Sequence, residues 1–141
     1  MFFLKDLPTR EMISGFAHSL DVVDVQKTGD ALQMLRRASL LIRQLERYFA
    51  LHGLSQTQFL VLMILHRDQS KHSHLAAEIC EKLDVSKPVV STTLKTMQRR
   101  GFIVYCEKAE DSRMKPLRIS DAGRELLLKL LPGYFEILQA G

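Results

Sequence analysis

Residues 85–126 of this chain read VSKPVVSTTLKTMQRRGFIVYCEKAEDSRMKPLRISDAGREL. Ser86 is a good helix N-cap, and Pro88 is tolerated in the first turn because its missing N–H is not needed there. Gly101 ends the helix that begins at these residues. Three apolar residues at helical spacing are expected to face inward: Val90, Leu94 and Met97. The opposite face is rich in small hydroxyls and cations.

Two stretches rich in β-branched and aromatic residues follow this helix, at 102–107 and 116–119. Both are typical of strands, and the charged segment KAEDSRMK between them is prone to turn. We therefore expect a β-hairpin with a basic tip. Ser120 then caps a last helix, which Pro132 and Gly133 are expected to kink or break.

Two helices are predicted upstream of this stretch. Apolar side chains recur at steps of three and four over residues 30–51, and Gly53 ends that helix. Ser55 and Gln58 have the spacing of a capping box at the start of a helix over 56–67. This second helix is apolar nearly all round, so it is expected in the centre of the core.

A short helix is expected to begin at Ser73 or His74 and to end at a tight turn made by Asp84 and Val85. Near the N-terminus, Thr9 is expected to cap another helix. The predicted order is helix, helix, short helix, turn, helix, hairpin, helix. This order predicts a mainly α, α+β fold of the winged helix-turn-helix class.

Length and composition indicate a single domain of ordinary size. The chain has 141 residues, of which 46% are hydrophobic and 26% charged, as in globular proteins. No apolar run reaches about 18 residues, so no membrane span is expected. The N-terminus lacks the features of a signal peptide, and the two cysteines are too few for a disulfide framework, so a cytoplasmic location is expected.

Charge is concentrated in one part of the chain. Residues 82–118 hold nine basic and four acidic side chains, a net charge of +5, whereas the remainder is close to neutral at −1. Such a segment is typical of a surface that binds a polyanion, although a solvated face has the same composition. No phosphate loop, nucleophile motif or marked pair of carboxylates is present, so neither enzymatic activity nor a cofactor is expected.

The predicted layout places the second short helix in the major groove of double-stranded DNA, with the hairpin beside it. Side chains of both elements are candidate DNA ligands, through base edges or phosphates. The candidates on the helix are Ser86, Lys87, Pro88, Ser91, Thr92, Lys95 and Arg99, and those on the hairpin are Lys108, Asp111, Arg113 and Lys115.

The same stretch resembles the recognition helix and wing of MarR-family regulators. The resemblance rests on an Asp-x-Arg pattern followed by a hydrophobic strand, a cap and a glycine, on an Arg-Gly pair that ends the helix, and on the leucine-rich FLVLMIL of residues 59–65. Here the residues of those patterns are Asp111, Arg113, Leu117, Ile119, Ser120, Gly123, Arg100 and Gly101. The resemblance covers roughly residues 30–131.

This resemblance implies that Arg113 enters the minor groove and that Asp111 holds it by a charge-assisted hydrogen bond. It further implies dimerisation helices at 1–52 and 120–141 and a DNA-binding region at 55–119. A homodimer on a pseudo-palindromic operator is therefore expected, acting as a repressor that responds to a small lipophilic or phenolic effector.

Two other classes of function remain open from the residues. A winged-helix module that binds a protein instead of DNA would share the fold. A metal or redox sensor would need a ligand set or a reactive thiol. His66, His72 and His74 lie close in sequence but lack an obvious set of partner ligands, so a solvated loop is favoured. Cys80 and Cys106 are expected to be small buried hydrophobes.

Overall fold

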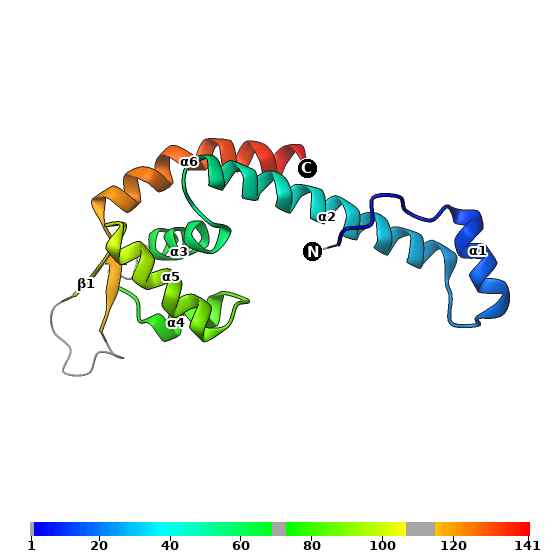
Figure 1. The fold of residues 1–141 in the computed structure, drawn as a ribbon, viewed down its shortest axis with the longest axis horizontal. Helices are drawn as coiled ribbons and strands as arrows, with labels where there is room; N and C mark the ends of the chain where they lie inside the picture. The colour runs from blue at the N-terminus through cyan, green and yellow to red at the C-terminus, as the bar shows by residue number, and fades with distance from the viewer. Residues whose placement is uncertain (1, 69–72, 107–114) are drawn as a thin grey trace.

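The computed structural model describes residues 2–68, 73–106 and 115–141 and is mainly helical, as the sequence predicted. In chain order the elements are α1 (Arg10–Ser19), α2 (Val25–Leu51), α3 (Gln56–Arg67), α4 (Ala76–Lys82), α5 (Lys87–Arg99), β1 (Ile103–Tyr105), β2 (Leu117–Ile119) and α6 (Asp121–Ala140). Figure 1 shows α6 lying alongside α2. Helices α3, α4 and α5 and the two strands form a body at one end of α2. Helix α1 lies at the opposite end of α2.

The winged-helix body, residues 45–134, is built around α3. Phe59, Val61 and Leu62 of this helix are fully buried, which confirms its predicted central place. The ring of Phe59 stacks on Phe49 of α2 with centroids 4.3 Å apart, and it meets Tyr134 of α6 at 4.8 Å. One aromatic cluster therefore joins α2, α3 and α6.

Local signals set the end of α2 and the start of α3. The Ser55 hydroxyl accepts from the Gln58 backbone N–H at 3.1 Å, and the Gln58 side chain accepts from the Ser55 N–H at 3.0 Å, so the predicted capping box is present. Gly53 has a φ of +74°, the left-handed conformation that ends α2. Within the described residues no single helix is long and apolar enough to cross a membrane, although α2 and α3 together satisfy the length and composition across an 83° bend.

Two predicted helix starts are wrong. The α2 helix begins at Val25 and not at residue 30, because the Asp24 carboxylate caps it by accepting from Lys27 N–H at 3.0 Å. The α4 helix begins after Leu75, whose N–H donates to the Glu78 carboxylate at 3.1 Å. Ser73 and His74 therefore precede α4 as extended chain.

The two strands form an antiparallel pair with a third contributor. Ile103 lies opposite Ile119 and Tyr105 opposite Leu117. On its other side Leu117 exchanges two backbone hydrogen bonds of 2.8 Å with His74. This bridge ties the segment before α4 to the hairpin and explains why His74 is extended and not helical.

The predicted break at Pro132 does not occur, since α6 runs continuously from Asp121 to Ala140. Proline removes one backbone donor from the helix. Near Pro132, Tyr48 of α2 contacts the helix, and its hydroxyl donates to the Leu130 carbonyl at 2.9 Å. Gly133 has no Cβ, and any side chain there would collide with the Tyr48 ring. The two residues thus fit α6 against α2 instead of ending it.

Candidate nucleic-acid interface

The orientation of α5 is fixed by its buried face. Val90, Leu94 and Met97 are at most 2% exposed, as predicted. With that face in the core, the rest of α5 points away from the body. Its exposed candidates are Lys87, Pro88, Ser91, Thr92, Lys95 and Arg99. The predicted separation of an apolar and a cationic, hydroxyl-rich face is therefore confirmed.

The N-terminus of α5 differs in one detail from the expected cap. Ser86 occupies the N-cap position, and its carbonyl accepts from Val90 N–H at 3.1 Å. Its hydroxyl makes no capping hydrogen bond. Pro88 lies in the first turn, as predicted. The exposed hydroxyl and backbone N–H groups of this turn face solvent, where an anion would be favoured by the helix dipole.

Hydroxyl groups on α5 fall into two sets. Those of Thr93 and Thr96 donate to carbonyls one turn earlier in their own helix, at 2.7 and 3.1 Å. Those of Ser91 and Thr92 make no hydrogen bond to the residues that the structure describes. Ser91 and Thr92 are thus the hydroxyls left to recognise a ligand, which agrees with their place among the candidates.

A hollow of about 460 Å³ lies between α4, α5 and the hairpin. Three ammonium groups surround it, from Lys87 and Lys95 on α5 and from Lys115 before β2. Tyr105 of β1 also lines it, and burial raises the pKa of this phenol, which therefore remains a hydrogen-bond donor at neutral pH. The fold thus brings Lys115 next to the helix candidates and gives the hollow a positive charge.

Arg100 was not among the candidates, yet it sets the position of α5. Its Nη1 donates to the Gly53 carbonyl at 2.6 Å and reaches the Gln58 side chain at 3.4 Å. Its guanidinium also lies over the Phe102 ring, 4.8 Å from the centroid. These contacts fasten the C-terminal end of α5 to the corner between α2 and α3. The Arg-Gly pair in the sequence was the available signal.

The base of the hairpin is held by the start of α6. The Ser120 hydroxyl caps α6 by accepting from Gly123 N–H at 3.0 Å, as predicted, and it donates to the Gly101 carbonyl. Ser120 N–H donates to the Phe102 carbonyl at 3.0 Å. A Cβ at Gly123 would collide with that same carbonyl. Glycine is therefore required where α6 crosses the strand.

Three candidates, Lys108, Asp111 and Arg113, lie outside the described residues, so the expected contact between Asp111 and Arg113 remains a prediction. His72 also lies outside them. His74 is buried and its Nε2 lies 3.8 Å from the Asp68 carboxylate. Among residues 2–68, 73–106 and 115–141, no three His, Cys, Asp or Glu side chains are grouped to hold a metal ion.

The two cysteines are less buried than expected. Cys80 and Cys106 are free thiols, and both side chains are half-buried. Cys80 packs against the core and lines the hollow beside α5. The hollow leaves the Cys80 thiol partly accessible.

Comparison with known sequences finds a match to the MarR family over residues 52–114, a range that includes α3, α4, α5 and β1. The HTH-type transcriptional repressor YetL of Bacillus subtilis (strain 168) is 28% identical over 137 residues, 97% of this chain and 81% of YetL. The match to YetL thus extends over nearly the whole chain, beyond the part that the family model covers.

Solved structures share the fold. AbsC, a MarR family transcriptional regulator from Streptomyces coelicolor, has a TM-score of 0.74 at 17% identity and covers 84% of this chain and 79% of its own. A mutant of MepR from Staphylococcus aureus, bound to an oligodeoxyribonucleotide, has a TM-score of 0.62 at 18% identity over 78% of this chain and 79% of its own. These likenesses concern the winged-helix architecture.

Proposed function

The chain belongs to the MarR family of transcriptional regulators, and on that premise we propose that it is a homodimeric repressor that binds a pseudo-palindromic operator in double-stranded DNA and responds to a small ligand. The observation that carries this proposal is the outer face of α5. It presents cations and unengaged hydroxyls on a helix whose other face is locked in the core. A helix of this kind fits the major groove.

In this proposal the contacts divide by role. Ser91, Thr92 and Lys95, near the middle of the exposed face, would reach base edges and phosphates. The lysines around the hollow beside α5 and the exposed N-terminal turn would hold the backbone phosphates. Arg113 would enter the minor groove from the hairpin tip, with Asp111 orienting it.

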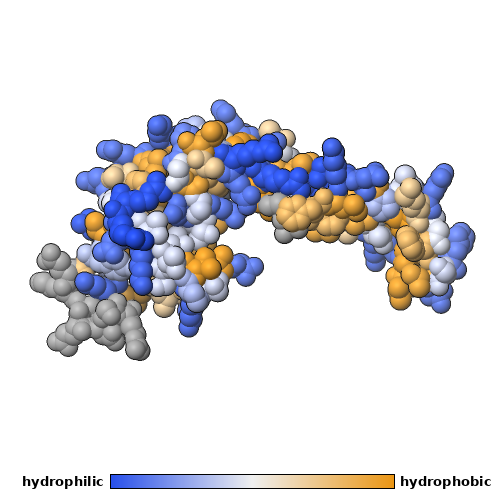
Figure 2. Space-filling view, viewed as in Figure 1, coloured by the Kyte–Doolittle hydropathy of each residue, from blue (hydrophilic) through white to orange (hydrophobic). Residues whose placement is uncertain are grey.

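A dimer is supported by apolar surface on the helices outside the body. Figure 2 shows hydrophobic surface gathered over the part of α2 that runs beyond the body and over α1. Outside the body, exposed large apolar side chains on α2 and α6 include Met34, Leu35, Leu40, Phe135 and Leu138. Contiguous apolar surface of this kind is typical of an interface, and a second copy of the chain is the simplest partner. Two α5 helices would then read two half-sites.

The comparisons support repression instead of activation, and DNA as the nucleic acid that is bound. YetL carries the name of a repressor and is similar to this chain over nearly its whole length. The MepR mutant was solved with an oligodeoxyribonucleotide and has the same fold. We therefore propose repression through DNA binding.

The test is selection from a random duplex library at about 150 mM salt, where a specific binder prefers its site over bulk DNA by roughly a thousandfold or more. An inverted repeat should be enriched by the wild type. Arg113→Ala should lose the enrichment, and Lys95→Ala should weaken binding by about tenfold. Lys129→Ala removes an exposed lysine from α6 and is the matched control, which should bind as the wild type does.

Enrichment by the wild type and the control, but not by Arg113→Ala, would support the proposal. No enrichment by the wild type would contradict it and would favour the winged-helix module that binds a protein. Enrichment that all four proteins share would contradict the assigned residues and keep the DNA-binding role.

A further inference from the structure

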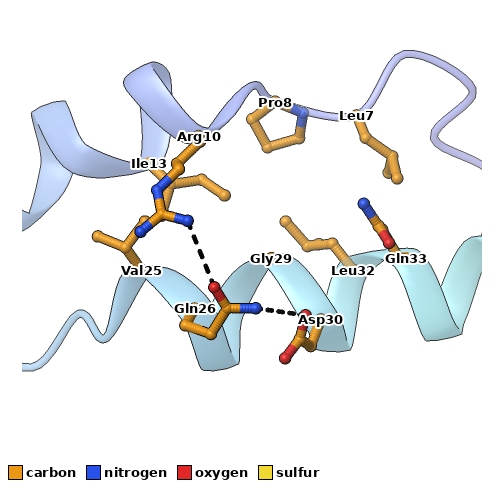
Figure 3. Close-up of a pocket in the computed structure, with 10 residues that line it drawn as sticks. All are labelled: Leu7, Pro8, Arg10, Ile13, Val25, Gln26, Gly29, Asp30, Leu32 and Gln33. Carbon is orange, nitrogen blue, oxygen red and sulfur yellow. Dashed lines mark hydrogen bonds between the residues drawn. The ribbon is translucent and has the colours of Figure 1, made fainter.

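The N-terminal arm, residues 2–33, contains a cavity far from the DNA-binding face. About 260 Å³ in volume, it lies between α1 with its preceding segment and the first turns of α2 (Figure 3). Pro8, Ile13 and Leu32 form its apolar walls, while Arg10, Gln26 and Asp30 stand at its rim. Apolar walls with a few convergent polar groups are the usual composition of a small-molecule site.

A second cavity of about 300 Å³ adjoins the first. The same three side chains, Pro8, Ile13 and Leu32, line both cavities. The second is almost wholly apolar, and Phe16 and Leu20, 61% and 48% exposed, form part of its wall. The arm thus offers a polar compartment and an apolar compartment that share a wall, which suits an amphiphilic molecule.

Gly29 is the residue that leaves the first cavity open. It lies inside α2, where glycine is the least favourable residue after proline. A Cβ at this position would lie 3.9 Å from Ile13 Cδ1, an ordinary contact, so the packing of α1 on α2 does not require glycine. A larger side chain, in contrast, would occupy the cavity that Gly29 lines.

Arg10, the cation at the rim, has N–H groups that are not engaged by its contact with Gln26. Gln26 Nε2 donates to the Asp30 carboxylate at 2.9 Å, which turns the Gln26 carbonyl oxygen towards Arg10. Arg10 Nη1 reaches that oxygen only at 3.4 Å, longer than a normal N–H···O bond of about 2.7–3.2 Å. Arg10 is exposed and its other N–H groups have the geometry to bind a carboxylate in a bidentate manner.

We propose that the arm binds an amphiphile with a carboxylate head and a hydrocarbon tail, of the class of medium-chain fatty acids. The head pairs with Arg10, and the tail lies against Ile13 and extends to Phe16 and Leu20. Asp30, already engaged by Gln26, lies on the other side of Gln26 from Arg10 (Figure 3).

The regulatory consequence rests on the proposed function, whereas the binding site does not. Asp30 and Gln33 also line a groove with Met34 and Leu41 of α2, on the surface proposed for the dimer. A ligand in the arm therefore touches the same helix face as the partner. Occupancy changes the dimer geometry, and with it the affinity for the operator.

The first test uses the full chain and calorimetric titration with dodecanoate, below its micelle concentration. Dodecanol and dodecyltrimethylammonium serve as matched probes with the same tail. Dodecanoate should bind with one site per chain, and dodecanol should bind about tenfold more weakly because the charge-assisted hydrogen bonds to Arg10 are lost. Absence of dodecanoate binding, or tighter binding of the ammonium, would overturn the proposal. A partner chain that fills the cavity in the dimer would give the first of these results.

Two variants locate the site. Gly29→Leu fills the cavity and should weaken dodecanoate binding by at least about tenfold, whereas Gly15→Ala adds a methyl where no atom lies within 4 Å and should not change it. Arg10→Gln should weaken dodecanoate about tenfold but leave dodecanol unchanged, with Lys27→Gln as its control. Wild-type binding by both Gly29→Leu and Arg10→Gln would overturn the assignment.

Dodecanoate binding in the absence of DNA and the selection of duplex DNA are measured in separate experiments. If dodecanoate binds but no duplex is enriched by the wild type, the arm site stands and the proposed function fails. If a duplex is enriched but dodecanoate does not bind, the arm site fails and the proposed function stands. If both bind, a change in operator affinity with added dodecanoate, lost in Gly29→Leu, supports the coupling, and an unchanged affinity contradicts it.

Discussion

The winged-helix body and the N-terminal arm are held together by different amounts of apolar contact. The body surrounds α3 with a continuous buried core that includes side chains of every other element except α1. Among described residues 2–44, in contrast, Ile13 is the only buried apolar side chain. The body therefore has the interactions to determine its own structure, whereas the arm leaves most of its apolar side chains exposed.

The largest expected effect separates the two regions by stability. Phe59 is fully buried in the aromatic cluster, so Phe59→Ala should lower the free energy of unfolding by about 3–5 kcal/mol. Phe16 is 61% exposed on α1, and Phe16→Ala should lower the free energy of unfolding of the monomeric chain by less than about 0.5 kcal/mol. Urea unfolding followed by circular dichroism measures both. Equal losses of unfolding free energy in the two variants would mean that Phe16 is buried in solution. The difference in burial between body and arm would then hold only for a single, unpartnered chain.

The body was the more predictable region because local signals determine its elements. Ser55, Gln58 and Gly53 set the ends of two helices through contacts within a few residues. The periodicity of Val90 and Leu94 gave the inward face of α5, and hence the exposed candidate site, without any tertiary information.

Features that depend on contacts between distant residues were not predictable. Pro132 was expected to kink or break α6, but the helix is unbroken, and Tyr48 donates a hydrogen bond to Leu130, 82 positions away in sequence. His74 pairs with Leu117 instead of starting α4. The Arg-Gly pair marked Arg100 in the sequence, but its contact with the Gly53 carbonyl, which gives it a positioning role, could not be predicted. For α1 the capping residue Thr9 predicted the helix, yet it could not show that Phe16 faces solvent.

A second, smaller effect on stability is expected where Gly123 of α6 crosses the chain at Phe102. A Cβ at Gly123 collides with the Phe102 carbonyl, a backbone atom that moves only with the hairpin, so Gly123→Ala should cost about 1–3 kcal/mol. Gly15→Ala in the arm is the matched control. It has open space and should raise the free energy of unfolding by up to about 1 kcal/mol if the arm unfolds with the body. A neutral Gly123→Ala would show that the hairpin base yields, and would weaken the description of the body as tightly determined.

The smallest predicted effect lies at the junction, where α2 leaves the body for the arm. Tyr48→Phe removes the hydrogen bond to the Leu130 carbonyl and should cost about 1 kcal/mol. Burial, and then the charge of Glu136, raise the pKa of the Tyr48 phenol. The neutral phenol is therefore favoured in the folded state.

The sign of the pH dependence follows from this shift. The contribution of Tyr48 is fully present below the unfolded pKa of about 10 and is lost as pH rises through the raised folded pKa. Tyr48→Phe should thus reduce the loss of stability between neutral and alkaline pH, measured by urea unfolding at each pH. Part of the loss should persist, because burial also raises the pKa of Tyr105 within the body. If Tyr48→Phe leaves the loss of stability at alkaline pH unchanged, the Tyr48 phenol does not contribute to the stability of the body. The boundary between body and arm would then lie closer to the centre of the body than residue 48.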